Sequence, residues 1–116
     1  MRRAGLLLLA SMSLGACASR PPSLYAWGNY EELIYASYAQ PASMPPDREV
    51  ERLEQDYQRA RAANARMPPG WHAHLGYMYF DLGKRDEAVR EFETEKAQYP
   101  EAGVFVDRLL ANLSKS

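Results

Sequence analysis

The sequence contains one cysteine, Cys17, among its 116 residues. A single cysteine excludes an internal disulfide, so the thiol of an exported chain needs another use. The sequence also lacks a long hydrophobic run, because the apolar stretch 4–14 is shorter than the about 20 residues that a helix needs to cross a bilayer. We therefore expect this stretch to be a signal and not a membrane anchor.

Few residues in the chain could support catalysis. There is no glycine-serine elbow and no phosphate-binding loop. Acidic side chains such as Glu91 and Glu95 alternate with arginine and lysine, as they do on a solvated helix face. We expect no catalytic residues, no enzyme activity and no cofactor.

Histidine is also scarce, since His72 and His74 are the only two. Residues two apart on a helix point to different faces, whereas a zinc-binding helix places its histidines four apart. A metal site built on this pair is therefore the weaker interpretation. We expect His72 to pack inside the fold and His74 to line a surface.

A clustered basic face is missing too. Loss of residues 1–16 would remove Arg2 and Arg3 from the 14 basic side chains and none of the 15 acidic ones, which leaves a net charge of −3. Proteins that bind nucleic acid usually carry a basic surface and have a high isoelectric point. We expect no nucleic-acid partner, and no polybasic stretch follows Cys17 to assist membrane binding.

The N-terminus has the order of a secretory signal peptide. Met1-Arg2-Arg3 precedes the apolar stretch, and Leu14-Gly15-Ala16-Cys17 closes it. These four closing residues resemble the lipobox of bacterial lipoproteins. The resemblance implies removal of a signal peptide of residues 1–16, acylation of Cys17 and anchoring to a membrane through more than one acyl chain. The alternative is a plain signal peptide with an incidental cysteine.

The residues after the cysteine indicate a destination and a tether. Lipoproteins with aspartate directly after the cysteine are typically kept in the inner membrane, and this chain has Ala18 there. The resemblance therefore implies a lipoprotein of the outer membrane that faces the periplasm. With Arg20-Pro21-Pro22 inside it, the segment 17–24 reads as a short, stiff, lipidated tether. Residues 25–116 are enough for one small domain.

Helical periodicity begins soon after this tether. Asn29 followed three residues later by Glu32 looks like a capping box at the start of a helix over 29–39. A loop rich in proline follows at 41–46, and apolar residues at helical spacing then predict a second helix over 47–66.

Beyond the break at 67–70 the spacing matches the tetratricopeptide pattern, a helical hairpin of roughly 34 residues. Glycine can bring two helices close together or end a helix in a left-handed turn, and an alanine followed by a phenylalanine can seat one helix against the other. The usual tryptophan and a later alanine of the pattern are replaced here by His72 and Glu95. The matching residues are Leu75, Gly76, Tyr79, Gly83, Ala88, Phe92 and Pro100.

The two earlier helices have the spacing of a degenerate first repeat, because Leu53 lies 35 residues before Ala88. After Pro100, an apolar face from Phe105 to Leu113 predicts a last helix that caps the stack, as terminal helices of solenoids do. The expected fold class is therefore all-α, with about five helices in tetratricopeptide-like hairpins and a C-terminal capping helix.

A candidate site follows from this pattern. Tyr77 and Phe80 lie beside His74 and Asp81, away from the packing side of their helix. In tetratricopeptide modules that side faces the concave groove. We take His74, Tyr77, Phe80 and Asp81 as candidate partner-binding residues. The alternative is that the aromatic side chains pack on the helix 47–66 as part of the core.

Three motifs resemble a further family. They are Tyr25-Ala26-Trp27-Gly28-Asn29-Tyr30-Glu31, Pro68-Pro69-Gly70-Trp71-His72-Ala73-His74-Leu75-Gly76-Tyr77, and Glu95-Lys96-Ala97 with Tyr99-Pro100-Glu101. The chain resembles a proteobacterial lipoprotein family classified as domain of unknown function 4810. Its members typically lie beside genes for a curli-secretion-channel-like lipoprotein and another small lipoprotein, which implies a shared assembly and assigns no reaction.

The function expected from these features is a non-catalytic protein-protein interaction adaptor in an envelope or secretion-related lipoprotein assembly. Its partner would be another envelope lipoprotein, such as a curli-secretion-channel-like one. The alternative is an accessory or activator of a periplasmic enzyme, or of cell-wall or polysaccharide export. A periplasmic hydrolase is a third class, for which the sequence offers no site.

Overall fold

The structure, a computed structural model, describes residues 22–115. The expected signal peptide, the acylated Cys17 and most of the tether 17–24 therefore lie outside the described residues. The described part of the chain is built from α-helices without a β-strand, and its only β-type pairing is an isolated bridge between Tyr25 and Arg66. The all-α expectation is confirmed.

Five α-helices and one short 3-10 turn follow one another along the chain. None of the helices in the described part is long and apolar enough to cross a membrane. Their bounds are Tyr30–Ala39 for α1, Pro46–Ala62 for α2, Trp71–Asp81 for α3, Arg85–Gln98 for α4, Pro100–Ala102 for the turn η1, and Gly103–Lys115 for α5.

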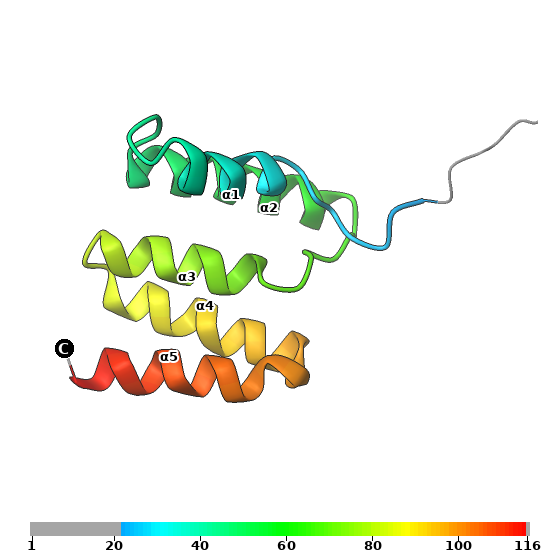
Figure 1. The fold of residues 1–116 in the computed structure, drawn as a ribbon. Coiled ribbons are helices and arrows are strands. Elements are labelled where there is room, and N and C mark those ends of the chain that lie inside the picture. Colours follow the sequence, from blue (N-terminus) through cyan, green and yellow to red (C-terminus); the bar gives the residue numbers. More distant parts are fainter. Residues whose placement is uncertain (1–21, 116) are drawn as a thin grey trace, which may run out of the picture.

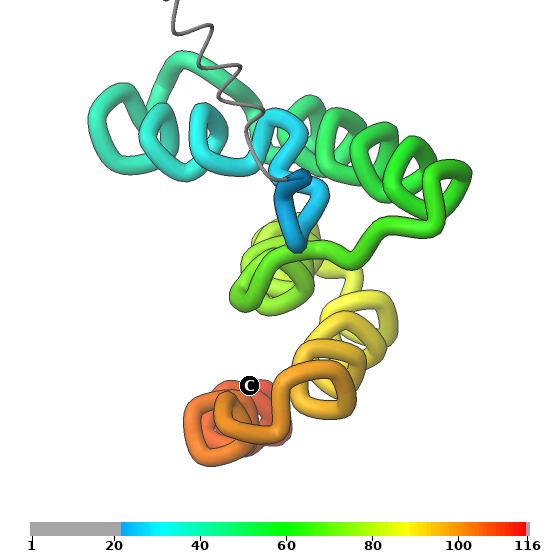
Figure 2. Tube along the Cα trace, turned by 90° about the vertical axis from the view of Figure 1, so that its right-hand side faces the viewer, coloured from blue at the N-terminus to red at the C-terminus, as the bar shows by residue number. Residues whose placement is uncertain are grey.

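The helices stack in two alternating rows (Figures 1 and 2). Each of α2, α3 and α4 contacts the next helix in the chain. In Figure 2, α1, α3 and α5 lie toward one side of the stack, and α2 and α4 lie toward the other. The chain therefore forms two helical hairpins, followed by α5 as a final helix on the side of α1 and α3.

The expected end of α2 was wrong by four residues, because α2 ends at Ala62 and not at residue 66. Asn64 has φ 51°, in the left-handed region where asparagine is among the better tolerated residues. The N–H of Ala65 then bonds to the carbonyl of Ala60 at 2.9 Å. This ending frees Arg66 to pair with the N-terminal segment.

The turn between α3 and α4 confirms the expected role of Gly83. Its φ is +73°, and it follows the last turn of α3. The N–H of Lys84 bonds to the carbonyl of Tyr79 at 2.8 Å, and the N–H of Gly83 bonds to that of Phe80 at 2.9 Å. This pair of bonds is a Schellman motif, which satisfies carbonyls that the helix end leaves open.

The close contact of α3 with α4 confirms the expected role of Gly76. A Cβ atom at this position would lie 2.8 Å from the ring of Phe92 and 3.1 Å from the carbonyl oxygen of Ala88. No side chain fits such a gap without displacing the ring. Ala88 and Phe92 are both buried, so the small-large pair seats the two helices as expected.

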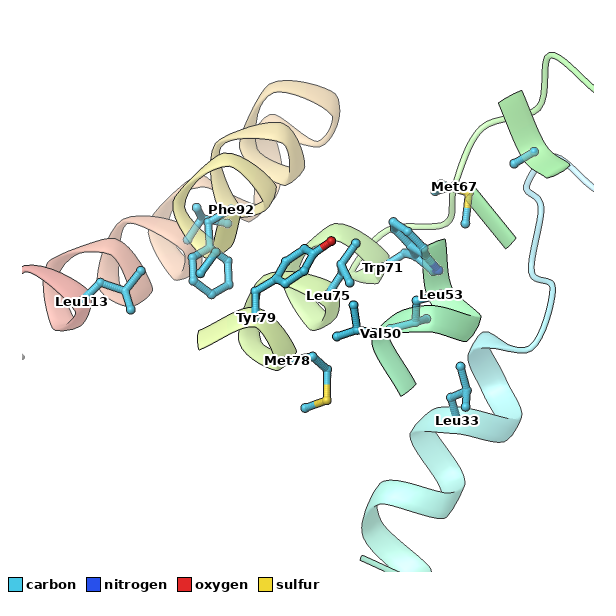
Figure 3. Close-up of a cluster of buried hydrophobic side chains, with 13 residues drawn as sticks. Leu33, Val50, Leu53, Met67, Trp71, Leu75, Met78, Tyr79, Phe92 and Leu113 are labelled. Carbon is cyan, nitrogen blue, oxygen red and sulfur yellow. The ribbon is translucent and has the colours of Figure 1, made fainter. Parts of the chain in front are cut away.

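A single core runs through the stack (Figure 3). Leu33 on α1 meets the α2 side chains Val50 and Leu53, and Trp71 and Leu75 on α3 continue the cluster. Phe92, Val106 and Leu113 extend it to α4 and α5. Full burial of such side chains contributes about 1.5–3 kcal/mol each, so this cluster is the main source of stability.

The segment before α1 is fixed to the end of α2. The N–H of Ala26 bonds to the carbonyl of Arg66 at 2.7 Å. The buried carboxylate of Asp56 accepts hydrogen bonds from the backbone N–H of Asn29 at 2.7 Å and from its side-chain amide at 3.0 Å. The capping box expected between Asn29 and Glu32 was therefore wrong, because Asn29 makes no side-chain cap bond to α1 and binds Asp56 instead.

Candidate functional site

A groove lined by aromatic side chains lies between α1, α3 and α5. It encloses about 410 Å³, and α1, α3 and α5 each supply a wall. We call this hollow the aromatic groove. Its lining residues are Tyr30, Ile34 and Tyr38 from α1, Gly70, Ala73, His74 and Tyr77 at the start and along α3, and Phe105 and Leu109 from α5.

Three aromatic side chains of the groove remain uncovered. Tyr38 is 85% exposed, Phe105 57% and Tyr77 51%. Single exposed apolar residues are common on monomeric proteins, whereas several exposed rings around one hollow mark an interaction surface. These rings sit on helices whose opposite sides pack into the core, so the core fixes the positions of these helices.

Two smaller hollows adjoin the groove, and Tyr77 lines both of them. One encloses about 180 Å³ and holds Phe80 against Leu109 of α5. The other encloses about 210 Å³ and has Asp81 at its edge, facing the loop between α1 and α2. Of the four residues predicted for partner binding, His74 and Tyr77 thus line the main groove, and Phe80 and Asp81 line its two extensions.

His74 is less free than the sequence suggested. Its Nε2 atom lies 2.6 Å from Oε1 of Glu49 on α2, and the same oxygen accepts a hydrogen bond from Ser37 at 3.1 Å. The ring of Tyr30 contacts the ring of His74 edge-on, with centroids 6.0 Å apart. His74 is partly exposed and lines the groove, as expected, and its contact with α2 holds it there as a fixed part of the wall.

The two histidines serve different contacts. His72 is buried, as expected, and its Nδ1 atom lies 2.6 Å from Oε2 of Glu91 on α4. His74 faces Glu49 on the other neighbouring helix, α2. The pair therefore links α3 to the helices on both sides and does not converge on one point where a metal ion could sit.

The alternative that the candidate aromatics are core residues of the helix 47–66 is not what the structure has. Tyr77 and Phe80 are 51% and 38% exposed, whereas their neighbour Met78 is buried. The helix turns Met78 and Tyr79 toward the core, so residues 77 and 80 face the opposite way. Both side chains are available on the outside of the described domain.

Sequence reasoning missed the contributions of α1 and α5 to the groove. Tyr30, Ile34 and Tyr38 recur every four residues, which places them on one helix face. That signal was readable, but the face could equally have been a packing face. Phe105 and Leu109 were assigned to the packing side of a capping helix, whereas both also line the groove.

A comparison with protein families identifies the chain. The family model described as a domain of unknown function, DUF4810, matches residues 24–109. The chain belongs to this family. The match covers the docked N-terminal segment, both helical hairpins and the groove-lining part of α5. No curated protein and no solved structure shows significant similarity to this family member.

Proposed function

We propose that this chain is a lipid-anchored, non-catalytic adaptor of the cell envelope that binds a segment of another envelope lipoprotein in its aromatic groove. The observation that carries the proposal is the groove itself, where Tyr38, Tyr77 and Phe105 are each more than half exposed on rigid helices. Aromatic side chains of this kind are enriched at the centres of protein interfaces and supply much of their binding energy.

The proposal includes a tetratricopeptide-type module of two repeats. Support comes from the two stacked hairpins, from the left-handed turn at Gly83 and from the close approach at Gly76. Repeat modules usually need about three repeats for stability, because each repeat buries its apolar face on a neighbour. Here α5 covers one end of the stack, and a bound partner would cover apolar side chains of α1, α3 and α5.

The charges around the groove favour a particular kind of partner. Two of the three walls, α1 and α3, contain Glu31, Glu32 and Asp81, outside the groove lining, but neither lysine nor arginine. The third wall, α5, contains Asp107, Arg108 and Lys115. The faces of tyrosine rings attract cations, and nearby carboxylates strengthen that attraction. The segment that fits best therefore carries apolar side chains together with lysine or arginine. The helices α2 and α4 do not line the groove, and their basic residues are Arg48, Arg52, Arg59, Arg61, Arg85, Arg90 and Lys96.

The anchor of the adaptor is the lipid on Cys17, which places the domain at the outer membrane, facing the periplasm. The lipobox-like residues before Cys17 and the lack of any second cysteine support this assignment. Replacement Cys17→Ser removes the thiol that acylation requires. Radiolabelled palmitate should label the wild-type chain and leave Cys17→Ser unlabelled, and equal labelling of both would refute the anchor.

The groove is tested by cross-linking in the intact, lipidated chain. A photoreactive phenylalanine at position 38 should form an adduct with a partner envelope lipoprotein, and the first candidate is the curli-secretion-channel-like one. Position 35 is the matched control, since Tyr35 lies on the same helix, is 70% exposed and does not line the groove.

Direct binding then decides the proposal. With the purified partner, Tyr38→Ala combined with Tyr77→Ala should weaken binding by about 2 kcal/mol or more, roughly thirtyfold. Tyr35→Ala should leave the affinity unchanged. Equal affinity of the groove variant and of Tyr35→Ala would exclude the groove as the binding site.

A further inference from the structure

The end of the domain at which the chain enters carries two exposed apolar side chains. Leu24 is 83% exposed and Trp27 is 39% exposed. The indole of Trp27 stacks on the ring of Tyr30 at 6.3 Å and meets the ring of Tyr25 edge-on at 6.3 Å. These contacts hold Trp27 in place and leave 39% of it exposed.

Two exposed arginines belong to the same end. Arg61 lies in the last turn of α2, and Arg66 lies in the loop after it, where it pairs with Tyr25. The guanidinium of Arg66 lies over the ring of Tyr99 at 5.3 Å, and that of Arg61 lies over the ring of Tyr57 at 5.8 Å. Figure 1 shows the N-terminal segment and the loop between α2 and α3 at one end of the stack.

We infer that this end of the domain rests on a phospholipid surface, with Leu24 and Trp27 in the interfacial layer and Arg61 and Arg66 on anionic headgroups. The inference rests on the proposed acylation of Cys17. Leu24 lies seven positions after Cys17, so even a fully extended tether spans only about 25 Å. An anchored chain cannot hold this end far from the bilayer.

The chemistry of these four side chains is suited to a membrane-water interface. Tryptophan is enriched at membrane-water interfaces, where its ring lies at the level of the headgroups. Leucine gains from leaving water, and each arginine close to an anionic surface is attracted to it. The groups are brought together by the fold, because Leu24 and Trp27 are far in sequence from Arg61 and Arg66.

This orientation would also leave the groove accessible. Tyr38 lies near the C-terminal end of α1, and Figure 1 shows the loop that follows α1 at the opposite end of the stack from the N-terminal segment. A partner could then reach the groove from the aqueous side. The membrane contact would use the end of the domain at Trp27, and a partner would enter the groove toward Tyr38. The two surfaces adjoin at Tyr30, which stacks on Trp27 and also lines the groove.

The test uses the whole chain from residue 17 onward with Cys17→Ser, which carries no acyl chain, so binding reports the protein surface alone. Vesicles of phosphatidylethanolamine with phosphatidylglycerol are compared with vesicles of phosphatidylcholine. Trp71 is fully buried, so acrylamide quenching reports Trp27. Quenching should decrease on addition of the anionic vesicles and change much less with phosphatidylcholine.

Variants locate the contact through co-sedimentation with the anionic vesicles. Leu24→Ser with Trp27→Ser should weaken partitioning about tenfold or more, and Arg61→Gln with Arg66→Gln about fivefold for each arginine. The matched controls are Tyr35→Ser, at an exposed position outside the groove, for the apolar pair and Arg48→Gln with Arg52→Gln for the arginines. These controls should bind as the parent does.

Unchanged quenching of Trp27 with anionic vesicles would overturn the inference, as would equal partitioning of the arginine variants and their controls. Circular dichroism checks that each variant is folded, and the quenching measurement needs no substitution at this end. The palmitate experiment on the wild-type chain is independent. Labelled wild type with no vesicle binding of the unacylated chain would remove the surface contact and keep the anchor.

Discussion

The carboxylate of Glu95 on α4 accepts a hydrogen bond from the backbone N–H of Gly70 at 2.6 Å, at the start of α3. Its second oxygen lies 3.3 Å from the N–H of Ala73. Gly70 is the N-cap residue of α3, with φ +89° and no side chain to accept these bonds. Glu95 therefore caps α3 from the neighbouring helix, where its negative charge also complements the positive end of α3.

This bond predicts the effect of restoring the alanine of the tetratricopeptide pattern. Glu95→Ala should destabilise the domain by about 1–3 kcal/mol, because it leaves buried N–H groups without acceptors. For a domain of this size that is about 4–8 °C in the melting temperature for each kcal/mol. Glu93→Ala, on the exposed side of the same helix, is the control. A melting temperature of Glu95→Ala at or above that of the wild type would show that the cap does not stabilise the fold.

Gly83→Val should destabilise through the backbone alone. A Cβ atom at this position would meet nothing within 4 Å, so no steric clash with neighbours contributes. The φ of +73° is the cause, because a β-branched residue in the left-handed region costs about 1–3 kcal/mol. Gly83→Asn should lower the free energy of unfolding less than Gly83→Val does, since asparagine tolerates the left-handed region. Thermal melting that ranks the valine variant equal to the asparagine variant would contradict this explanation.

Removing the exposed aromatics of α3 should change binding and leave the fold intact. We expect Tyr77→Ala with Phe80→Ala to melt within a few degrees of the wild type, because Tyr77 is 51% and Phe80 38% exposed and neither belongs to the buried core. Truncation of a core aromatic, as in Phe92→Ala, should instead cost about 3–5 kcal/mol. Thermal melting of both variants checks this contrast. If the double variant unfolds, Tyr77 and Phe80 contribute to the core and their assignment to the groove is wrong.

Alkaline pH should destabilise the domain through three tyrosines. Burial raises the pKa of Tyr30, Tyr79 and Tyr99 above the usual 10.0, and a hydrogen bond to Glu54 adds to the effect at Tyr79. Below pH 10 these groups are protonated in both the folded and the unfolded chain, so their contribution to the free energy of unfolding is fully present. As the pH rises above 10, the unfolded chain ionises first, and stability falls through the folded pKa values.

The melting temperature should therefore stay level up to about pH 9 and fall from about pH 10. Tyr79→Phe should reduce the slope of that fall, whereas Tyr35→Phe, at an exposed position, should not. Spectroscopic titration of the folded protein checks the cause. If all eight tyrosines ionise together near pH 10, the raised pKa values are wrong.

The sequence alone determined the helices and their turns, because the signals for them are local. Periodicity of apolar residues located every helix, and their spacing in the pattern predicted the roles of Gly83 and Gly76. The errors were local signals overridden by distant partners. Asn29 looked like a helix cap, yet the buried carboxylate of Asp56 offers it a stronger acceptor.

Only the tertiary structure decided where the proposed binding surface lies. The groove joins Tyr38, Tyr77 and Phe105 from three helices, and no periodicity within one helix reports which faces of the others it meets. Likewise Arg66 reaches Tyr25 only because Asn64 ends α2 in a left-handed turn. Local patterns set which face of a helix is apolar, whereas packing decides which part of that face is covered and which part stays open to a partner.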